Sequence, residues 1–324
     1  MNNEERKIFW NKLCSLDGTD LNADSATLRT TIIYPKYIYR FRAVNDNTIK
    51  ALQSNTLYFS SPLQYDDPFD TYLTIKWEII KEKIESINTS SQETYDKFIK
   101  GCELLGLPTD ELSFEKFSIF SKEQILRFTI HNLVNYIRPH IQKNLFSLCF
   151  AEEPLNENLW LKYADAHKGF CLGFSLEDKS KLIDDNPLTL YPVYYSDEKY
   201  DGTKYAVNAL AYYLTEMQNP YIAKLYAQEN PLHWEPEKVS LIKHKCHEYD
   251  AEWRIISHNP DRSHIKWIPS RLYIGFRTSE ADKKRIIGAA NEAGIEQIYK
   301  VIISPTNDLA IEEMSTGEKE KYLQ

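Results

Sequence analysis

The chain has 324 residues, enough for one large domain or two modest ones with a proper core. Its 39 lysines and arginines are outnumbered by 47 aspartates and glutamates, so the net charge of −8 argues against unspecific adhesion to nucleic acid or acidic membranes. A hydrophobic content of 42%, with 22 tyrosines and 14 phenylalanines, excludes wholesale disorder.

The cysteines and the first residues bear on the cell compartment. The five cysteines are scattered and form no C-x-x-C pair, so we expect neither a disulfide framework nor a structural zinc ribbon. The start, MNNEERKIFW, lacks the basic residues and apolar run of a signal peptide. No apolar run approaches the roughly 18 residues that span a bilayer. We therefore expect a cytoplasmic protein with no membrane partner.

The N-terminal third of the chain begins with an expected extension. Residues 1–33 combine a short amphipathic helix with a polar segment, which predicts a peripheral extension. Aromatic and β-branched residues in 34–42 predict the first strand. Asn45 or Asp46 then caps a helix, and residues 57–61 form the next strand, which ends at a turn rich in Asp and Pro.

The rest of the chain predicts an α+β fold. Helical patterns dominate residues 72–142, which we expect to be a helical insertion that forms a lid or a side layer. Later strand and helix patterns predict a central mixed or antiparallel sheet with flanking helices. We expect residues 34–306 to form a single domain that includes the insertion, and the charged tail 307–324 to fray.

One stretch, residues 158–174, is unusually dense in polar and aromatic side chains. Trp160, Tyr163 and His167 follow one another at steps of three and four, so a helix would place them on one face. Gly169 is expected to end that helix, and residues 170–174 can leave as a strand. A purely structural interpretation makes the two aromatic residues core and the polar ones a solvated turn.

Several phrases of the sequence together resemble the DUF2971 family of bacterial proteins. They are YRF (39–41), LYFSSP (57–62) with DDPFD (66–70), SLCFAE (147–152), LW-x-x-YAD-x-HKGFCLGF (159–174) and EWRII (252–256). The family pattern usually has Asn where this chain has Asp66. The family is named for its unknown function. Its members look like accessory-genome proteins, so the resemblance implies a role in bacterial defence, for example against phage, or as a toxin.

The polar residues of these phrases predict a cleft where several segments converge. Strands and turns supply the set, which we expect to meet at strand ends: Arg40, Ser60, Ser61, Asp66, Asp67, Asp165, His167 and Glu252. Aromatic side chains beside it, including Tyr39 and Trp160, are suited to stacking on a base or on nicotinamide. We expect Tyr39, Ser61, Asp67, Trp160 and Tyr163 to bind the ligand.

The first hypothesis is an ADP-ribosyltransferase-like enzyme that uses NAD as its substrate. Arg40, Ser60 and Glu252 have the order of an anchoring Arg, a Ser-containing strand and a late catalytic Glu in such enzymes. Arg40 would hold the pyrophosphate or ribose, and Glu252 would stabilise an oxocarbenium-like transition state. The structural alternative is that Arg40 and Glu252 form an ion pair.

Two other hypotheses remain open. In one, His167 acts as a general base, oriented by Asp165 or another carboxylate, in a hydrolase that acts on a nucleotide or an ester. In the other, the cleft is not catalytic and senses a nucleotide or binds a partner, which agrees with the absence of strong catalytic motifs. No metal is expected, because His244 and His247 share H-x-x-H spacing without a defined third ligand. A protein or nucleic-acid acceptor and the oligomeric state stay open.

Overall fold

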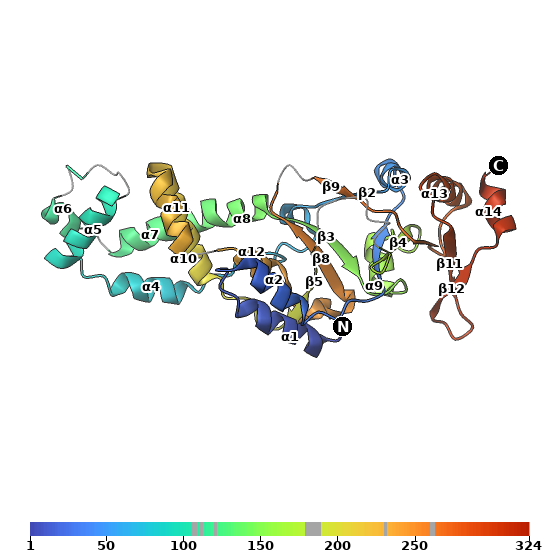
Figure 1. Ribbon diagram of the computed structural model, residues 1–324, viewed down its shortest axis with the longest axis horizontal. Coiled ribbons are helices and arrows are strands. Elements are labelled where there is room, and N and C mark those ends of the chain that lie inside the picture. Colours follow the sequence, from blue (N-terminus) through green and yellow to red (C-terminus); the bar gives the residue numbers. More distant parts are fainter. Residues whose placement is uncertain are drawn as a thin grey trace.

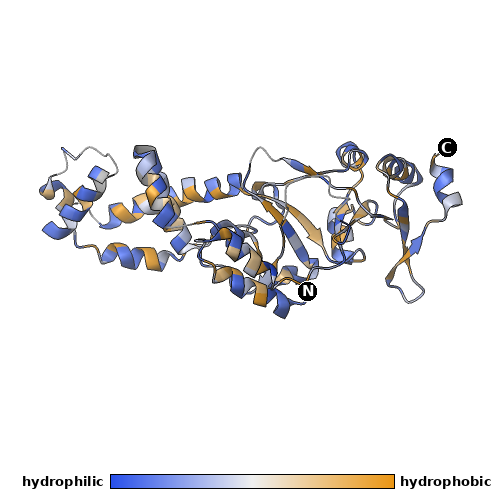
Figure 2. Cartoon of the chain, viewed as in Figure 1, coloured by the Kyte–Doolittle hydropathy of each residue, from blue (hydrophilic) through white to orange (hydrophobic). Residues whose placement is uncertain are grey.

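The structure is a computed structural model that describes residues 1–104, 109–110, 113–119, 122–178, 189–229, 232–259 and 263–323. The molecule is elongated, with a sheet in the middle, an arm of helices at one end and the C-terminal elements at the other (Figure 1). Hydrophobic residues concentrate on the central strands, whereas the helices of the arm alternate between hydrophobic and hydrophilic residues (Figure 2).

Eight strands of the described residues form the central sheet in the order β12-β11-β10-β4-β1-β3-β8-β5. Their bounds are β1 Tyr37–Arg42, β3 Phe146–Ala151, β4 Phe170–Ser175, β5 Leu190–Pro192, β8 Glu252–Ser257, β10 Arg271–Ile274, β11 Gln297–Ile303 and β12 Leu309–Glu313. Neighbouring strands are antiparallel except β10 and β11, which are parallel. The sheet is therefore mixed, and the predicted α+β fold with a mixed central sheet is confirmed.

The two neighbours of β1 pair with it very differently. β1 and β4 pair along their whole length, from Tyr37 opposite Ser175 to Arg42 opposite Phe170. Between β1 and β3, in the described part of the chain, the one ladder pair is Tyr39 opposite Ala151. Side chains alternate across a strand, so Arg40 and Arg42 share one face of β1. The separation of β1 from β3 makes room for the cavity described below.

Two smaller pairs of strands lie outside this sheet. β2 (Thr56–Tyr58) pairs with β9 (His264–Lys266), and β6 (Tyr194–Ser196) pairs in parallel with β7 (Ile242–His244). Residues after Pro236 had a helical pattern, but they form a short helix α12 (Glu235–Ser240), strand β7 and a 3₁₀ helix (Lys245–Asp250). Pairing with β6 overrides the local helical preference there.

The helix termini follow local sequence signals. Helix α3 (Asp46–Gln53) begins at Asn45, whose side chain accepts a hydrogen bond from the Thr48 backbone N–H in a reciprocal capping box. Ser279 caps helix α13 (Glu280–Glu292) in a similar way, by accepting a hydrogen bond from the Asp282 N–H. The Asn45 cap is one of the two positions predicted from the sequence, and Ser279 is a residue type that favours the same position.

The helical arm has an apolar core of its own. It contains α4 (Trp77–Glu85), α5 (Gln92–Leu104), α6 (Phe114–Ser118), α7 (Lys122–Asn132), α8 (Arg138–Asn144), α10 (Thr203–Gln218) and α11 (Pro220–Glu229). A π-helical turn, Leu133–Ile137, joins α7 to α8. Ile80, Leu133, Ile137 and Leu210 are buried together in a cluster separate from the main core. Among the described helices, none combines the length and the apolar character needed to cross a bilayer.

The N-terminal segment is not peripheral, which corrects the expectation for residues 1–33. Helix α1 (Asn3–Cys14) and helix α2 (Leu21–Arg29) place Phe9, Leu13 and Leu28 in the main core with no exposed surface. The buried Arg6 donates hydrogen bonds to the carbonyl oxygens of Val193 (2.8 Å) and Glu252 (2.7 Å). Helix α1 therefore supports the start of β8.

The C-terminal segment is also part of the fold, contrary to the expected frayed tail. Strand β12 pairs with β11, and helix α14 (Thr316–Leu323) follows it. Met314 is 4% exposed, and the Lys300 ammonium lies 2.7 Å from the Glu318 carboxylate. The charges that suggested fraying are paired across these elements.

Gly169 lies where the chain passes close to the end of β1. A Cβ atom added there would lie 2.1 Å from the carbonyl oxygen of Arg42 and 3.0 Å from the Cα of Ala164. Because both contacts are with backbone, we expect Gly169→Ala to lower the free energy of unfolding by at least about 1–3 kcal/mol. Chemical denaturation measures this loss.

The matched control is Gly288→Ala. Gly288 lies within α13, and a Cβ atom added there has no neighbour within 4 Å. This change should stabilise the protein by about 0.5–1 kcal/mol, because alanine favours a helix over glycine. Equal effects of the two substitutions would contradict the close approach at Gly169.

Candidate functional site

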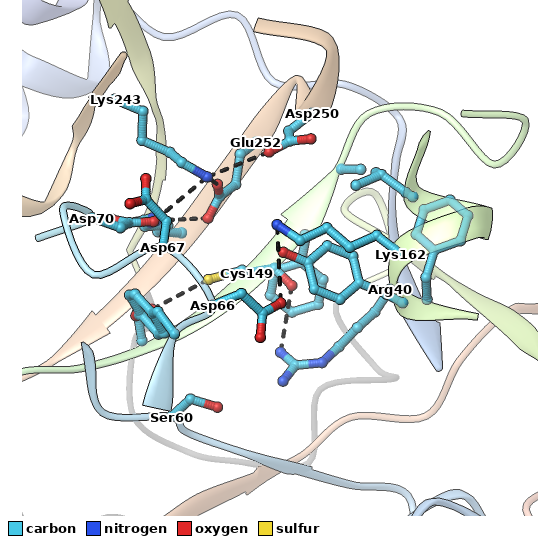
Figure 3. A pocket seen from close by; sticks show the side chains of 18 of the residues that line it. Arg40, Ser60, Asp66, Asp67, Asp70, Cys149, Lys162, Lys243, Asp250 and Glu252 are labelled. Carbon is cyan, nitrogen blue, oxygen red and sulfur yellow. Dashed lines mark hydrogen bonds and ion pairs between the residues drawn. The ribbon is translucent and has the colours of Figure 1, made fainter. Parts of the chain in front are cut away.

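A cavity of about 300 Å³ opens beside the separated strands β1 and β3. Its walls come from β1, β3, β8, helix α9 (Glu157–Tyr163), β7 and the turn after β2. Figure 3 shows charged side chains from these segments pointing toward the same space. The lining includes Arg40, Arg42, Ser60, Tyr65, Asp66, Asp67, Asp70, Cys149, Lys162, Tyr163, Lys243, Asp250, Glu252 and Arg254.

Most of the residues predicted for the cleft do meet here. The cavity is lined by Tyr39, Arg40, Ser60, Asp67, Tyr163 and Glu252. They lie far apart in the sequence and come from four different segments. The structural condition of the first hypothesis, that Arg40, Ser60 and Glu252 face one cavity, is met.

His167 does not line the cavity, because the chain leaves the helix before reaching it. Helix α9 ends at Tyr163, and Asp165, Ala166 and His167 have φ angles of 46°, 52° and 67°. This left-handed turn carries the His167 ring onto Trp160, with centroids 5.9 Å apart and planes within 8° of parallel. The expectation that Trp160, Tyr163 and His167 share one helical face is therefore wrong.

The arrangement around His167 also argues against the hydrolase hypothesis. The Asp165 carboxylate lies 3.7 Å from the Lys168 ammonium, and the His167 Nδ1 atom has no partner in the described part of the chain. Burial lowers the pKa of His167, so the ring is neutral at pH 7. Among the described residues, no carboxylate accepts a hydrogen bond from the His167 ring to orient it as a general base.

Two other predicted ligand-binding residues have structural roles instead. Trp160 is fully buried, and its indole N–H donates to the carbonyl oxygen of Pro154 at 2.7 Å. The Ser61 hydroxyl donates to the carbonyl oxygen of Gln142 at 2.9 Å and caps the short 3₁₀ helix Pro62–Gln64. Neither residue lines the cavity.

Glu252 belongs to a buried network of ion pairs at one end of the cavity. Its carboxylate lies 2.7 Å from Arg254 Nε and 2.8 Å from Lys243 Nζ. The Arg254 guanidinium also forms a two-pronged pair with Asp70, at 2.8 and 2.6 Å. Lys243 lies 3.4 Å from Asp250, and Figure 3 shows these groups gathered together. Three carboxylates at this end thus share two cations.

This network fixes the charge of Glu252. Burial alone would raise the pKa of its carboxyl group, but Arg254 and Lys243 outweigh that effect and hold the pKa well below the usual value. Glu252 is therefore ionised wherever the protein is folded near neutral pH. Such a carboxylate accepts hydrogen bonds and does not donate a proton.

The lowered pKa predicts a specific acid sensitivity. The contribution of Glu252 to stability is complete above the unfolded-state pKa of about 4.3 and is lost as the pH falls toward the folded-state pKa. We expect the melting temperature of Glu252→Gln to fall less steeply than that of the wild type between about pH 5 and 3. Identical slopes would show that the carboxylate is not stabilised by the network.

Arg40 and Arg42 lie away from that network and form no ion pair with a described acidic side chain. Arg40 is 7% exposed, and its guanidinium makes only long hydrogen bonds, to the carbonyl oxygens of Cys149 (3.5 Å) and Tyr58 (3.4 Å). Burial lowers the pKa of Arg40, and burial together with the charge of Arg40 lowers the pKa of Arg42. Both remain cations at neutral pH. The two guanidinium groups therefore line the cavity without an ion-pair partner among the described residues.

The cavity offers no activated nucleophile among the groups whose pKa is shifted. Burial raises the pKa of the Cys149 thiol to about 11, so the thiol is protonated and unreactive at pH 7. Burial also raises the pKa of Tyr65 well above its ordinary value. The charged lining is suited to binding and orienting an anion, with a carboxylate at the opposite end.

Several residues that line the cavity were not predicted from the sequence. Arg42 follows Arg40 by two on the same strand, and Arg254 follows Glu252 by two, so strand alternation was a usable signal for both. Lys243 lay in a segment with a helical pattern, which concealed its strand position. Asp70 ends the phrase DDPFD but was not singled out, and Lys162 had no local signal that distinguished it from a solvated charge.

The fold and the cavity define an α+β protein with a charged, partly open site. A family model described as "Protein of unknown function (DUF2971)" matches residues 159–255, from α9 to β8. The chain thus carries a DUF2971 segment, which confirms the resemblance predicted from the sequence. Tyr163, Lys243 and Glu252 lie inside the matched range, whereas Arg40 and Ser60 precede it. No curated protein matches the chain, and no solved structure does.

Proposed function

We propose that the cavity binds a nucleotide through its phosphate groups. The observation that carries this proposal is the pair of Arg40 and Arg42, two cations on one strand face that line the cavity without an ion pair to any acidic side chain in the described part of the chain. A guanidinium binds phosphate oxygens with two parallel hydrogen bonds. The volume of about 300 Å³ lies at the lower end of the range for small-molecule sites.

The opposite end of the cavity suits the uncharged part of such a ligand. In a dinucleotide such as NAD, Glu252 and Asp250 offer carboxylate oxygens that can accept hydrogen bonds from the hydroxyl groups of the nicotinamide ribose, which lies beyond the phosphates. Tyr163 is 39% exposed, so part of its ring is open to contact. The lining therefore combines cations for phosphate with acceptors for sugar hydroxyls.

A panel of related ligands tests this proposal. ADP and NAD should raise the melting temperature of the protein, since a ligand at 100 times its dissociation constant adds about 2.7 kcal/mol of stability. Adenosine, which has no phosphate, should have little effect at the same concentration. Equal stabilisation by adenosine, or none by any of the three, would contradict phosphate recognition.

NAD cleavage followed by ADP-ribose transfer is the second candidate, favoured because Arg40, Ser60 and Glu252 line one cavity. The glycosidic bond would break with its electron pair leaving on nicotinamide, and a nucleophile of the acceptor would bond to the ribose carbon and lose its proton. Glu252 would accept a hydrogen bond from a ribose hydroxyl and stabilise the positive charge that develops. A defence or toxin role belongs to this candidate.

Incubation with labelled NAD, with and without cell lysate, separates enzyme from sensor. Release of nicotinamide or transfer of the label, lost in Glu252→Gln, would support the enzyme. Stabilisation by NAD without either event would favour a non-enzymatic module that senses a nucleotide. The same assay with Arg271→Met, a surface change, controls for general damage.

A further inference from the structure

A second, smaller cavity of about 150 Å³ shares Arg40 and Arg42 with the first. It lies between the face of β1 and β4 and the elements α3, β2 and the residues that follow β9. Apart from the shared arginines its walls are mostly apolar, and they include Leu52, Leu57, Phe170 and Leu172. The two arginines therefore stand at the boundary between a charged cavity and an apolar one.

Three buried polar atoms on residues that line this second cavity have no hydrogen-bond partner in the described residues. They are the Nε atom of Arg40, the indole Nε1 atom of Trp267 and the side-chain oxygen of Asn55. Arg40 is 7% exposed and Trp267 is 5% exposed. Buried polar groups are normally paired, so three unpaired ones at one small cavity call for a ligand that pairs them.

The two neutral groups are held in place by the fold. The backbone N–H of Trp267 donates to the carbonyl oxygen of Asn55 at 2.9 Å, which fixes the two residues beside each other. The Trp267 ring packs against Phe174 and Phe150, with centroids 5.1 and 6.0 Å away. The amide nitrogen of Asn55 donates to the carbonyl oxygen of Ala293 at 3.2 Å, which leaves the amide oxygen as an acceptor. The fold thus fixes the position of one hydrogen-bond donor, the Trp267 indole N–H, and one acceptor, the Asn55 side-chain oxygen, on residues that line the cavity.

We propose that the second cavity holds the base of the nucleotide whose phosphates are bound by Arg40 and Arg42. A base such as adenine presents a ring-nitrogen acceptor next to an amino donor, which complements the Trp267 N–H and the Asn55 oxygen. Apolar walls suit the faces of a planar ring, and a cavity of this size accepts one six-membered aromatic ring, so we expect the six-membered ring of adenine, which carries the amino group, to enter it. This assignment rests on the proposed phosphate recognition and extends it to the base.

Two substitutions test the base site while leaving the phosphate-binding arginines intact. Trp267→Phe keeps an aromatic side chain but removes the unpaired N–H together with part of the indole volume, and should weaken ADP binding roughly 3- to 10-fold, the effect of one neutral hydrogen bond. Ala51→Leu adds volume at the wall of the cavity and should weaken ADP binding more than 10-fold. Isothermal titration calorimetry with ADP and with pyrophosphate measures both effects.

Pyrophosphate separates the two proposals, because it has phosphates and no base. Its affinity should change less than twofold in either variant. Trp234→Phe is the control, since Trp234 is buried in the main core and its N–H is bonded to Asp24. If ADP and pyrophosphate bind the wild type and neither variant discriminates between them, the base site is wrong and phosphate recognition stands. If neither ligand binds the wild type, both proposals fail.

Discussion

Replacing Arg40 with methionine is expected to abolish tight nucleotide binding while leaving the protein at least as stable as the wild type. In the folded chain the guanidinium is buried against the Phe150 ring, 5.7 Å from its centroid, without an ion-pair partner among the described residues. A buried cation without a carboxylate costs free energy, and methionine keeps most of the packing. Arg40→Met should therefore lower the nucleotide affinity without lowering the free energy of unfolding.

The loss of binding should be large. A hydrogen bond to a charged group contributes about 1.5–3 kcal/mol, which corresponds to roughly a 10- to 100-fold change in the dissociation constant. Calorimetry with ADP and urea denaturation, run on the same preparations, measure the two quantities. Arg271→Met is the matched control, because Arg271 stacks on Tyr37, 4.0 Å from the ring centroid, away from the cavity lining. Unchanged ADP affinity in Arg40→Met would remove the basis of the proposed function.

Arg254→Met should have the opposite signature, a severe loss of stability. Arg254 is 1% exposed and pairs with both Glu252 and Asp70. Its removal leaves two buried carboxylates to share Lys243, and breaking a buried pair by removing one partner costs about 3–5 kcal/mol. Urea denaturation should show a correspondingly lower midpoint.

Two variants bracket this result. Glu252→Gln should cost less than Arg254→Met, because Asp70 and Asp250 still face the two remaining cations. Arg285→Met, at an exposed ion pair with Asp46, should cost about 1 kcal/mol or less. A loss below about 1 kcal/mol in Arg254→Met would mean that the ion network does not hold the cavity together.

The features that the sequence predicted well are those with a local cause. In the caps at Asn45 and Ser279, the side chain accepts a hydrogen bond from a backbone N–H three residues later. The β-branched and aromatic content of β1 likewise predicts a strand. The convergence of Arg40 and Glu252 was also predictable, since each is carried by a strand phrase typical of one family. Local chemistry and family phrases together located most of the cavity.

The features that the sequence did not predict have causes that lie far away in the chain. Lys243 reaches the cavity because β7 pairs with β6, about fifty residues earlier, against a helical local pattern. His167 lies outside the cavity, where its carbonyl oxygen accepts a hydrogen bond from the Arg277 N–H at 3.1 Å and its ring packs on Phe276, with centroids 4.7 Å apart. Arg6 ties the first helix to β8 through backbone acceptors that no sequence pattern reveals. In each case long-range pairing decided what local preference could not.

The central claim, that Arg40 and Arg42 form a phosphate site, is tested most directly by a crystal structure of the protein grown with ADP. We expect phosphate oxygens of ADP within hydrogen-bonding distance of both guanidinium groups, in the cavity that β1 shares with β3 and β8. ADP bound elsewhere on the molecule, or no ADP in this cavity at saturating concentration, would contradict it.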